Sequence, residues 1–201
     1  MEIFQEVCDK AHERGIKVHL DGARIFNAAC YLKSTVRELT AAADTVMFCL
    51  SKGLGAPAGS MLVGSADLIE RGRLYRKRLG GAMRQAGVLA AAGLIALEEM
   101  PRRLEEDHVN ARFLATQLVK IPGIQLDPAR VQTNIVIFDV SETGRTPAEL
   151  SACLEGRGVL MNAVNSRQMR AVTHYDVTRK DCERAAETIS DALASQLVNT
   201  R

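Results

Sequence analysis

The apolar residues in the first half of the chain alternate between helical spacing and short continuous runs that are typical of buried strands. Residues 1–14 carry apolar side chains at helical spacing, and Gly15 ends that pattern. The chain therefore opens inside an amphipathic helix, with no capping residue before it. The order strand, helix, strand that follows indicates a βαβ crossover in a doubly wound sheet. The pattern predicts helices at 1–14, 25–31, 36–43, 67–79 and 85–100, and strands at 16–20, 45–50 and 61–63.

The second half has a different texture, because short strands and helices alternate after residue 123. Pro101 suits the first turn of a long helix. We expect a domain boundary inside that helix, so that residues 1–105 form one domain and residues 106–201 form a small α+β domain. The pattern predicts helices at 101–120, 147–155 and 178–198, and strands at 134–140, 159–161 and 169–172.

The helix predicted at 85–100 has small or apolar residues over almost its whole circumference. A helix of that composition is buried between layers of one chain or between subunits. We therefore expect this helix to lie at a subunit interface, with a buried connector between two domains of one monomer as the alternative.

The composition of the 201 residues narrows the class of protein. The 26 basic and 24 acidic residues give a net charge of +2, and this balance argues against nucleic acid or a membrane as the main partner. No apolar run approaches the length of a membrane span, and we expect no signal peptide before the first helix. The 5 cysteines are scattered and lack C-x-x-C spacing, so we expect reduced thiols without a metal in a cytoplasmic protein.

The candidate chemistry begins at the loop Ser51-Lys52-Gly53-Leu54-Gly55-Ala56-Pro57, which follows the strand predicted at 45–50. Glycine and proline break regular structure, so this loop presents Lys52 at the end of a buried strand. A lysine that is desolvated there has a lowered pKa and can attack a carbonyl carbon. A solvated loop lysine without chemistry is the alternative.

Asp21 ends the strand predicted at 16–20, at the same edge of the sheet as Lys52. Ligands of open α/β sheets bind at the carboxyl ends of the strands. Pyridoxal phosphate requires a lysine for its Schiff base and a carboxylate that keeps its ring nitrogen protonated. Asp21 and Lys52 together fit that cofactor, and an ion pair without chemistry is the alternative.

Four segments resemble the low-specificity threonine aldolases, which are fold-type I pyridoxal-phosphate enzymes. They are His19–Ala28 (HLDGARIFNA), Cys49–Pro57 (CLSKGLGAP), Gly80–Gly93 (GGAMRQAGVLAAAG) and Arg170–His174 (RAVTH). The resemblance covers essentially the whole chain. It implies an α/β fold in which residues 1–105 are the C-terminal part of the large cofactor-binding domain. It also implies a carbon–carbon lyase (aldehyde-lyase) that cleaves L-threonine or L-allo-threonine to glycine and acetaldehyde.

The resemblance also implies roles for individual residues. Lys52 matches the lysine that forms the Schiff base, and Asp21 matches the partner of the pyridine nitrogen. Arg24 matches an arginine near the cofactor hydroxyl and the substrate carboxylate. Arg170 matches the small-domain arginine that binds the α-carboxylate of the β-hydroxy-α-amino acid substrate. A bidentate guanidinium suits a carboxylate, so a lysine would not replace Arg170.

Lys77 and Arg84 lie in a stretch that borders the active site across the subunit interface in this family. The resemblance therefore implies a homo-oligomer, either a dimer or a tetramer, with shared active sites. Family members also carry an N-terminal portion, absent from this sequence, that supplies the phosphate-binding turn and a histidine stacked on the cofactor ring. We expect an aldolase that is incomplete as this chain, with a catalytically silent fragment that associates with intact subunits as the alternative. A racemase, decarboxylase or aminotransferase of the same fold is the competing chemistry.

The remaining candidates have simpler explanations. His19 shares a strand face with the candidate aspartate and is expected to be structural, and His174 is expected to brace the candidate arginine rather than to react. His12 and His108 lie on predicted helices beside acidic residues, where we expect them to be solvated. The glycines of the lysine loop are spaced G-x-G-x-x-x-G and follow the lysine, so they do not match a dinucleotide-binding loop.

Overall fold

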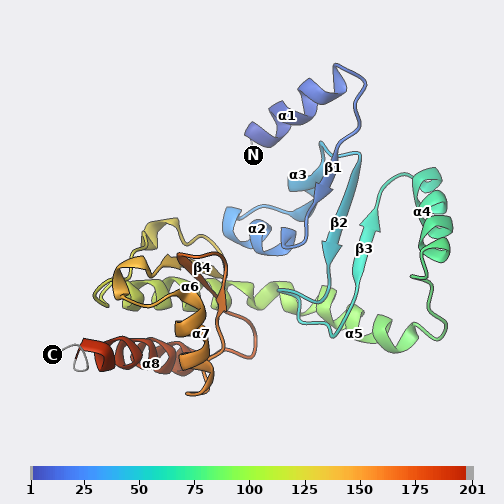
Figure 1. The fold of residues 1–201 in the computed structure, drawn as a ribbon. Helices are drawn as coiled ribbons and strands as arrows, with labels where there is room; N and C mark the ends of the chain where they lie inside the picture. Colours follow the sequence, from blue (N-terminus) through green and yellow to red (C-terminus); the bar gives the residue numbers. More distant parts are fainter. Residues whose placement is uncertain (1, 198–201) are drawn as a thin grey trace. The chain divides into compact units, whose positions relative to one another are not determined.

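The computed structural model describes residues 2–197, with side chains as far as Ala194. The chain forms two compact units, one that ends at Leu104 and one that begins at Glu105 (Figure 1). The elements of the first unit are α1 (Glu2–His12), β1 (His19–Asp21), α2 (Ile25–Leu32), α3 (Val36–Thr40), β2 (Thr45–Cys49), β3 (Ser60–Val63), α4 (Ala66–Arg78), α5 (Gly87–Glu98) and the short 3₁₀ helix η1 (Met100–Arg103). Those that follow are α6 (Leu104–Leu118), η2 (Pro128–Arg130), β4 (Ile135–Asp139), η3 (Ser141–Thr143), α7 (Pro147–Glu155), β5 (Asn162–Ala163), β6 (Gln168–Val172) and α8 (Arg179–Leu197). Within this part of the chain, no helix is both long enough and apolar enough to span a bilayer.

The first unit is built on a three-stranded sheet in the order β1-β2-β3. β1 and β2 are parallel, with Asp21 opposite Met47, and α2 and α3 form the connection between them. This arrangement is the βαβ crossover that the sequence predicted. β3 pairs antiparallel to β2. Leu20 and Phe48, on one face of the sheet, pack against buried side chains of α2 and α3.

β1 begins at His19, whereas the sequence predicted that it would begin at Ile16. The Ile16 amide donates to the Ala11 carbonyl at 2.9 Å, so this residue belongs to the turn that ends α1. The Val18 amide donates to the Asp44 carboxylate at 2.8 Å. These contacts occupy the backbone groups that a longer β1 would have paired with β2.

α5 is largely exposed within this chain, which does not fit a buried connector between two domains of one monomer. Only Gly93 and Ala96 of this helix are buried, whereas Val88 is 72% exposed and Leu94 is 59% exposed. Ala96 packs in the cluster around Leu50, which covers one narrow stripe of the helix. Most of the apolar circumference of α5 is therefore uncovered within this chain.

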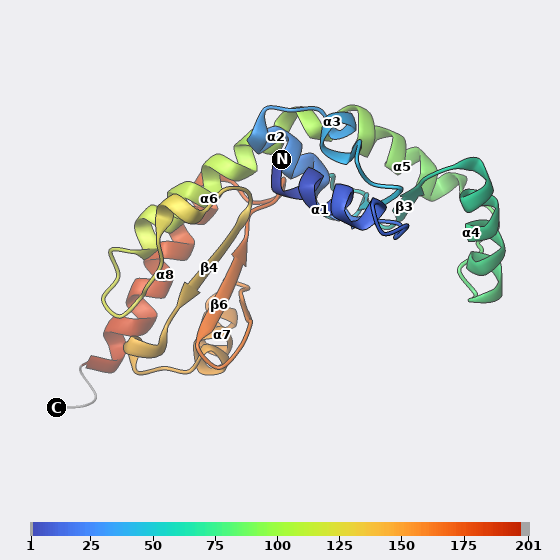
Figure 2. The same cartoon turned by 90° about the horizontal axis from the view of Figure 1, so that it is seen from above.

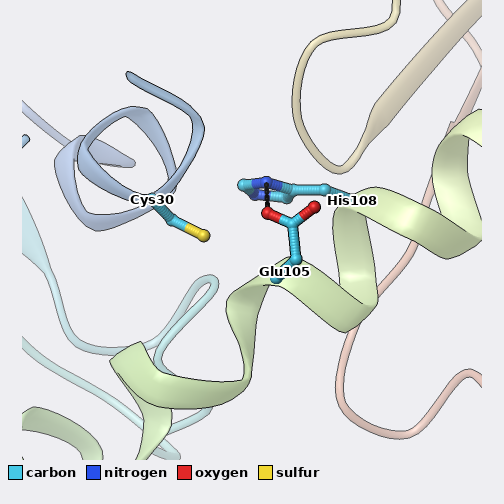
Figure 3. Close-up of side chains that lie close together, drawn as sticks. All are labelled: Cys30, Glu105 and His108. Carbon is cyan, nitrogen blue, oxygen red and sulfur yellow. Dashed lines mark ion pairs between the residues drawn. The ribbon is translucent and has the colours of Figure 1, made fainter. Parts of the chain in front are cut away.

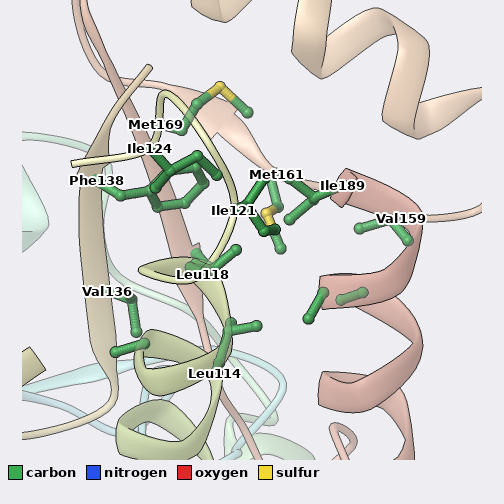
Figure 4. Packing of buried hydrophobic residues seen from close by; sticks show 14 of the residues in the cluster. Leu114, Leu118, Ile121, Ile124, Val136, Phe138, Val159, Met161, Met169 and Ile189 are labelled. Carbon is green, nitrogen blue, oxygen red and sulfur yellow. The ribbon is translucent and has the colours of Figure 1, made fainter. Parts of the chain in front are cut away.

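The second unit contains a three-stranded antiparallel sheet in the order β4-β6-β5, with β6 in the centre. α6, α7 and α8 pack their apolar sides against one face of this sheet (Figure 2). The core between these layers includes Phe138 of β4, Leu118 of α6 and Ile189 of α8 (Figure 4). Because side chains alternate along a strand, Ile137 and its cross-strand partner Arg170 lie on the opposite, exposed face.

β5 covers Asn162–Ala163, so the strand predicted at 159–161 is wrong. The Val159 amide donates to the carbonyl of the last turn of α7 at 2.9 Å, and the Met161 carbonyl accepts from the Ser151 hydroxyl at 2.6 Å. Both side chains are buried, as the alternating pattern suggested. The Val159 amide and the Met161 carbonyl, however, are bound by α7 rather than by a neighbouring strand.

Capping threonines explain where three of the helices begin. Thr35, Thr146 and Thr178 each exchange hydrogen bonds with an acidic residue three positions later, before α3, α7 and α8 respectively. The helix predicted at 147–155 is confirmed as α7. α8 confirms the last predicted helix, of which Val198 lies outside the described residues.

Candidate active site

The parallel pair of β1 and β2 brings the predicted Asp21 and Lys52 to the same edge of the first sheet. Asp21 is the last residue of β1 and lies opposite Met47 of β2. Lys52 is the third residue after Cys49, where β2 ends. Both side chains are exposed in this chain, so a ligand can reach them from solvent.

The turn after β1 is held tightly by its backbone. The Gly22 amide donates to the Met47 carbonyl at 2.8 Å, and the Ala23 amide donates to the Asp21 carboxylate at 3.1 Å. A Cβ atom on Gly22 would lie 2.9 Å from the Met47 carbonyl oxygen, so a side chain cannot be accommodated there. The turn ends at Arg24, the residue before α2. Asp21 and Arg24 are thus presented from the two ends of one fixed turn.

The lysine loop is closed by three backbone hydrogen bonds of 3.0 Å. The Ala56 amide donates to the Leu50 carbonyl, the Gly55 amide to the Lys52 carbonyl, and the Leu50 amide to the Gly59 carbonyl. Gly55 has a φ of 72°, which favours glycine. Leu54 is only 2% exposed and anchors the loop in the apolar core. Lys52 itself is exposed in this chain, and its desolvation stays a prediction.

Arg170 lies in β6, the central strand of the second sheet. Its strand neighbours are Ile137 of β4 and Asn162 of β5. Its side chain is exposed, and the structure records no ion pair or hydrogen bond of its guanidinium within residues 2–197. The guanidinium is therefore available to bind an anion.

A buried clasp, which the sequence did not reveal, holds the end of β6. The Thr173 hydroxyl donates to the Asp107 backbone carbonyl at 2.6 Å, and the side-chain amide nitrogen of Asn134 donates to the Thr173 backbone carbonyl at 2.8 Å. The Thr173 amide donates in turn to the Asn134 carbonyl at 3.0 Å. The Asn110 side chain donates to the Val177 carbonyl at 3.2 Å. These contacts tie the end of the strand that carries the candidate arginine, and the loop after it, to α6 and to the residue before β4.

His108 is fully buried, so the expectation that it is solvated was wrong. Its Nδ1 atom lies 4.0 Å from a carboxylate oxygen of Glu105, one turn earlier on α6 (Figure 3). Leu104 and Ala111 are also buried, and with His108 they have the spacing of one helix face. This spacing is the signal in the sequence that could have placed His108 on the covered side of the helix.

The other histidines make local contacts. His19 Nδ1 lies 2.8 Å from the Thr45 hydroxyl, which fits the structural role expected of it. His174 Nδ1 lies 3.2 Å from the Asp176 carboxylate, and its bracing of the candidate arginine stays a prediction. His12 is exposed on α1, as expected.

Asp44 is a carboxylate outside the candidate site that receives three hydrogen bonds. Lys17 Nζ, the Val18 amide and His12 Nε2 each lie 2.8 Å from one of its oxygens. The Lys17 hydrogen bond, followed by the other two, holds the pKa of Asp44 far below its ordinary value. Asp44 thereby ties the end of α1 to the start of the sheet.

Lys77 and Arg84 lie on either side of the glycines that end α4. Lys77 is in the last, basic turn of α4, and Arg84 is in the segment before α5. Both side chains are exposed in this chain. Their position across a subunit interface stays a prediction.

Comparisons with known proteins place these features in a family. The family model for beta-eliminating lyases matches residues 1–142. Low-specificity L-threonine aldolase 1 of Arabidopsis thaliana is 45% identical over 182 residues, which are 90% of this chain and 51% of that protein. The low specificity L-threonine aldolase of Escherichia coli K12 is 43% identical over 185 residues, which are 92% of this chain and 54% of that protein. The resemblance inferred from the motifs is confirmed.

A solved structure supports the fold class. The crystal structure of a candidate L-allo-threonine aldolase of Listeria monocytogenes aligns with a TM-score of 0.77 at 19% identity, over 94% of this chain and 55% of that one. The α/β fold class expected from the sequence is confirmed. This chain spans about half the length of the curated relatives it matches.

Proposed function

Because this chain belongs to the beta-eliminating lyase family, we propose that it carries the lysine-bearing part of a pyridoxal-phosphate-dependent aldolase. The reaction is the cleavage of L-threonine or L-allo-threonine to glycine and acetaldehyde. The observation that carries the proposal is the placement of Asp21 and Lys52 at the carboxyl ends of two adjacent parallel strands. The relatives named as threonine aldolases support the substrate class.

The donor set fits pyridoxal phosphate. An aldehyde needs an accessible primary amine, and Lys52 is exposed in a loop that Leu54 and Ala56 anchor in the apolar core. A pyridine nitrogen needs a carboxylate, and Asp21 is exposed at the neighbouring strand end. When bound, the cofactor supplies a sink for the electrons released as the Cα–Cβ bond of the substrate breaks.

The residues of this chain bind and orient the reacting groups. The Lys52 amine would hold the cofactor at its aldehyde group, and the Asp21 carboxylate would keep a proton at the ring nitrogen. Arg24, at the other end of the Gly22 turn, assists with the cofactor hydroxyl and the substrate carboxylate. The backbone bonds that fix this turn keep Asp21 and Arg24 at a constant separation.

Arg170 is the proposed ligand of the α-carboxylate. Its guanidinium is exposed and presents two parallel N–H groups, which match the two oxygens of a carboxylate. A fixed carboxylate restricts rotation of the substrate and selects the bond that is aligned for cleavage. The buried clasp at Thr173 and Asn134 holds the strand that carries Arg170.

The remaining groups of the site belong to the rest of the enzyme in this proposal. The relatives are about twice as long as the matched region. We propose that the phosphate ligands and the proton acceptor for the β-hydroxyl lie outside the 201 residues. The alternative is a catalytically silent chain that associates with intact subunits.

The test is cofactor binding by the purified chain. Pyridoxal phosphate bound to a lysine amine absorbs near the edge of the visible range, and we expect Lys52→Ala to abolish that band. Lys120→Ala, which removes another exposed lysine, should leave the band unchanged. A band retained in Lys52→Ala would refute the lysine assignment. A wild-type chain that binds no cofactor would favour the silent alternative.

We also propose that the protein is a homo-oligomer whose contacts include α5. The exposed apolar residues Val88, Leu94 and Ile95 on this helix form a surface that water solvates poorly. Exposed Lys77 and Arg84, which precede this helix in the chain, are the proposed contributors to a neighbouring site. Sedimentation at micromolar concentration tests this proposal, and a monomer that stays soluble would refute it.

A further inference from the structure

Asn27 is a buried polar side chain on α2, in the unit that carries Asp21 and Lys52. It is 2% exposed and lies between the buried residues Ile25 and Ala29 of the same helix. Burial of an amide is unfavourable unless polar partners replace water, and asparagine is a weak helix former. An apolar residue would fill a purely apolar contact better. The presence of an amide therefore indicates that this position faces polar backbone.

The backbone that Asn27 faces is that of Gly53, the residue after Lys52. A Cβ atom built on Gly53 would lie 3.2 Å from Cγ and 3.3 Å from Nδ2 of Asn27, and closer still to Oδ1. The space that a side chain of residue 53 would occupy is thus filled by the amide of Asn27. Glycine permits this close approach because it has no Cβ atom.

The other contacts of the lysine loop hold different parts of it. The backbone bonds of Gly55 and Ala56 close the loop, and Leu54 anchors it in the core. The contact with Asn27 fixes the chain at the position directly after Lys52. It also joins the loop to α2, the helix that begins where the Asp21 turn ends.

We propose that Asn27 is a positioning residue for Lys52. Its amide fixes the path of the loop at Gly53, and thereby the direction in which the Lys52 amine is presented. This role rests on the proposed function, because it is the amine chemistry of Lys52 that requires a fixed direction. Asn27 itself touches neither the cofactor nor the substrate in this proposal.

The first test is hydrogen exchange of the lysine loop, measured by mass spectrometry on the 201-residue chain. In Asn27→Ala we expect the amides of Gly55 and Ala56 to exchange about tenfold faster, while those of β2 keep wild-type rates. Asn110→Ala is the matched control, because it removes another buried amide whose contact lies in the second unit. Loop exchange that is the same in Asn27→Ala and in the wild type would overturn the proposal.

Gly53→Ala tests the same contact by changing the glycine instead of the asparagine. This variant tests the positioning role even if Asn27→Ala unfolds the first unit. The added methyl group meets the amide of Asn27, so loop exchange should rise in this variant while β2 is unchanged. Asn27→Ser combined with Gly53→Ala should raise exchange by less than the product of the two single effects, because the shorter side chain leaves room. No rise in Gly53→Ala, or effects that multiply, would overturn the proposal.

The reactivity of the Lys52 amine separates this proposal from the function on which it rests. The chain is treated with pyridoxal phosphate and borohydride, and the label on Lys52 is compared with that on exposed Lys120. We expect a preference for Lys52 that falls about threefold or more in Asn27→Ala. Without a preference in the wild type the proposed function fails, and the exchange measurements still decide the role of Asn27. A preference that Asn27→Ala leaves unchanged would overturn the positioning role alone.

Discussion

Replacing Thr173 with valine removes one hydroxyl group from the buried clasp at the end of β6 and nearly preserves the shape of the side chain. This hydroxyl donates to the Asp107 carbonyl at 2.6 Å, and Thr173 is only 1% exposed, so water cannot replace the lost bond. Loss of such a bond lowers the free energy of unfolding by about 1–3 kcal/mol. With a urea m-value of about 2 kcal/mol/M, the midpoint of unfolding should fall by roughly 0.5–1.5 M.

The assay is urea unfolding of the chain followed by circular dichroism. Thr116→Val is the matched control. The Thr116 hydroxyl donates to the Phe113 carbonyl of α6 at 2.7 Å, as the Thr173 hydroxyl donates to the Asp107 carbonyl of α6, but Thr116 is exposed. We expect the control to change the free energy of unfolding by no more than about 0.5 kcal/mol. Equal losses in Thr173→Val and Thr116→Val would show that burial of the clasp contributes nothing, and the reasoning would be refuted.

Two further predictions concern the site and the first unit. Arg170→Lys in the complete enzyme should raise KM and lower kcat for threonine, because the point charge of a lysine loses the bidentate fit to the carboxylate. Losing such a charge-assisted pair costs about 2–4 kcal/mol of transition-state stabilisation, which lowers kcat/KM by some tens to hundreds of fold. Unchanged kinetics of threonine cleavage would remove Arg170 from the site. The hydrogen bond from Lys17, with those from Val18 and His12, lowers the pKa of Asp44 in the folded state. The ionised Asp44 therefore stabilises the fold fully above its unfolded pKa of about 3.9, and this contribution is lost as the pH falls towards the lower folded pKa. Asp44→Asn should therefore flatten the acid limb of the stability profile between about pH 4 and pH 2, measured by urea unfolding, and an unaltered limb would contradict this assignment.

Helices that begin with a capping motif could be predicted from the sequence. The helix at 147–155 begins at Thr146, whose side chain and that of Glu149 form a capping box, so the signal lies within four residues. The strand at 159–161 could not be predicted correctly, because alternating burial does not say whether the backbone pairs with a strand or with a helix side chain. Here the Ser151 hydroxyl takes the carbonyl that a strand partner would have bound.

The candidate site could be predicted as far as the order of elements determines it. Asp21 and Lys52 follow two strands joined by a helical crossover, and this order alone places them at one sheet edge. The supporting polar residues could not be predicted, because their contacts join distant parts of the chain. Asn134 and Thr173 are 39 positions apart, and the contact of Asn27 with the lysine loop depends on how α2 packs.

The central position of β6 has a consequence for how the proposed activity would be lost on heating. Arg170 lies in a strand with backbone partners on both sides, in β4 and β5. Lys52 lies in the loop after β2, outside the strand pairing, and three backbone hydrogen bonds close that loop. Local opening begins where backbone contacts are fewest, so warming should disorder the lysine before the arginine. Over that interval of temperature, the strand that carries the proposed carboxylate ligand would persist after the proposed reactive amine has lost its place.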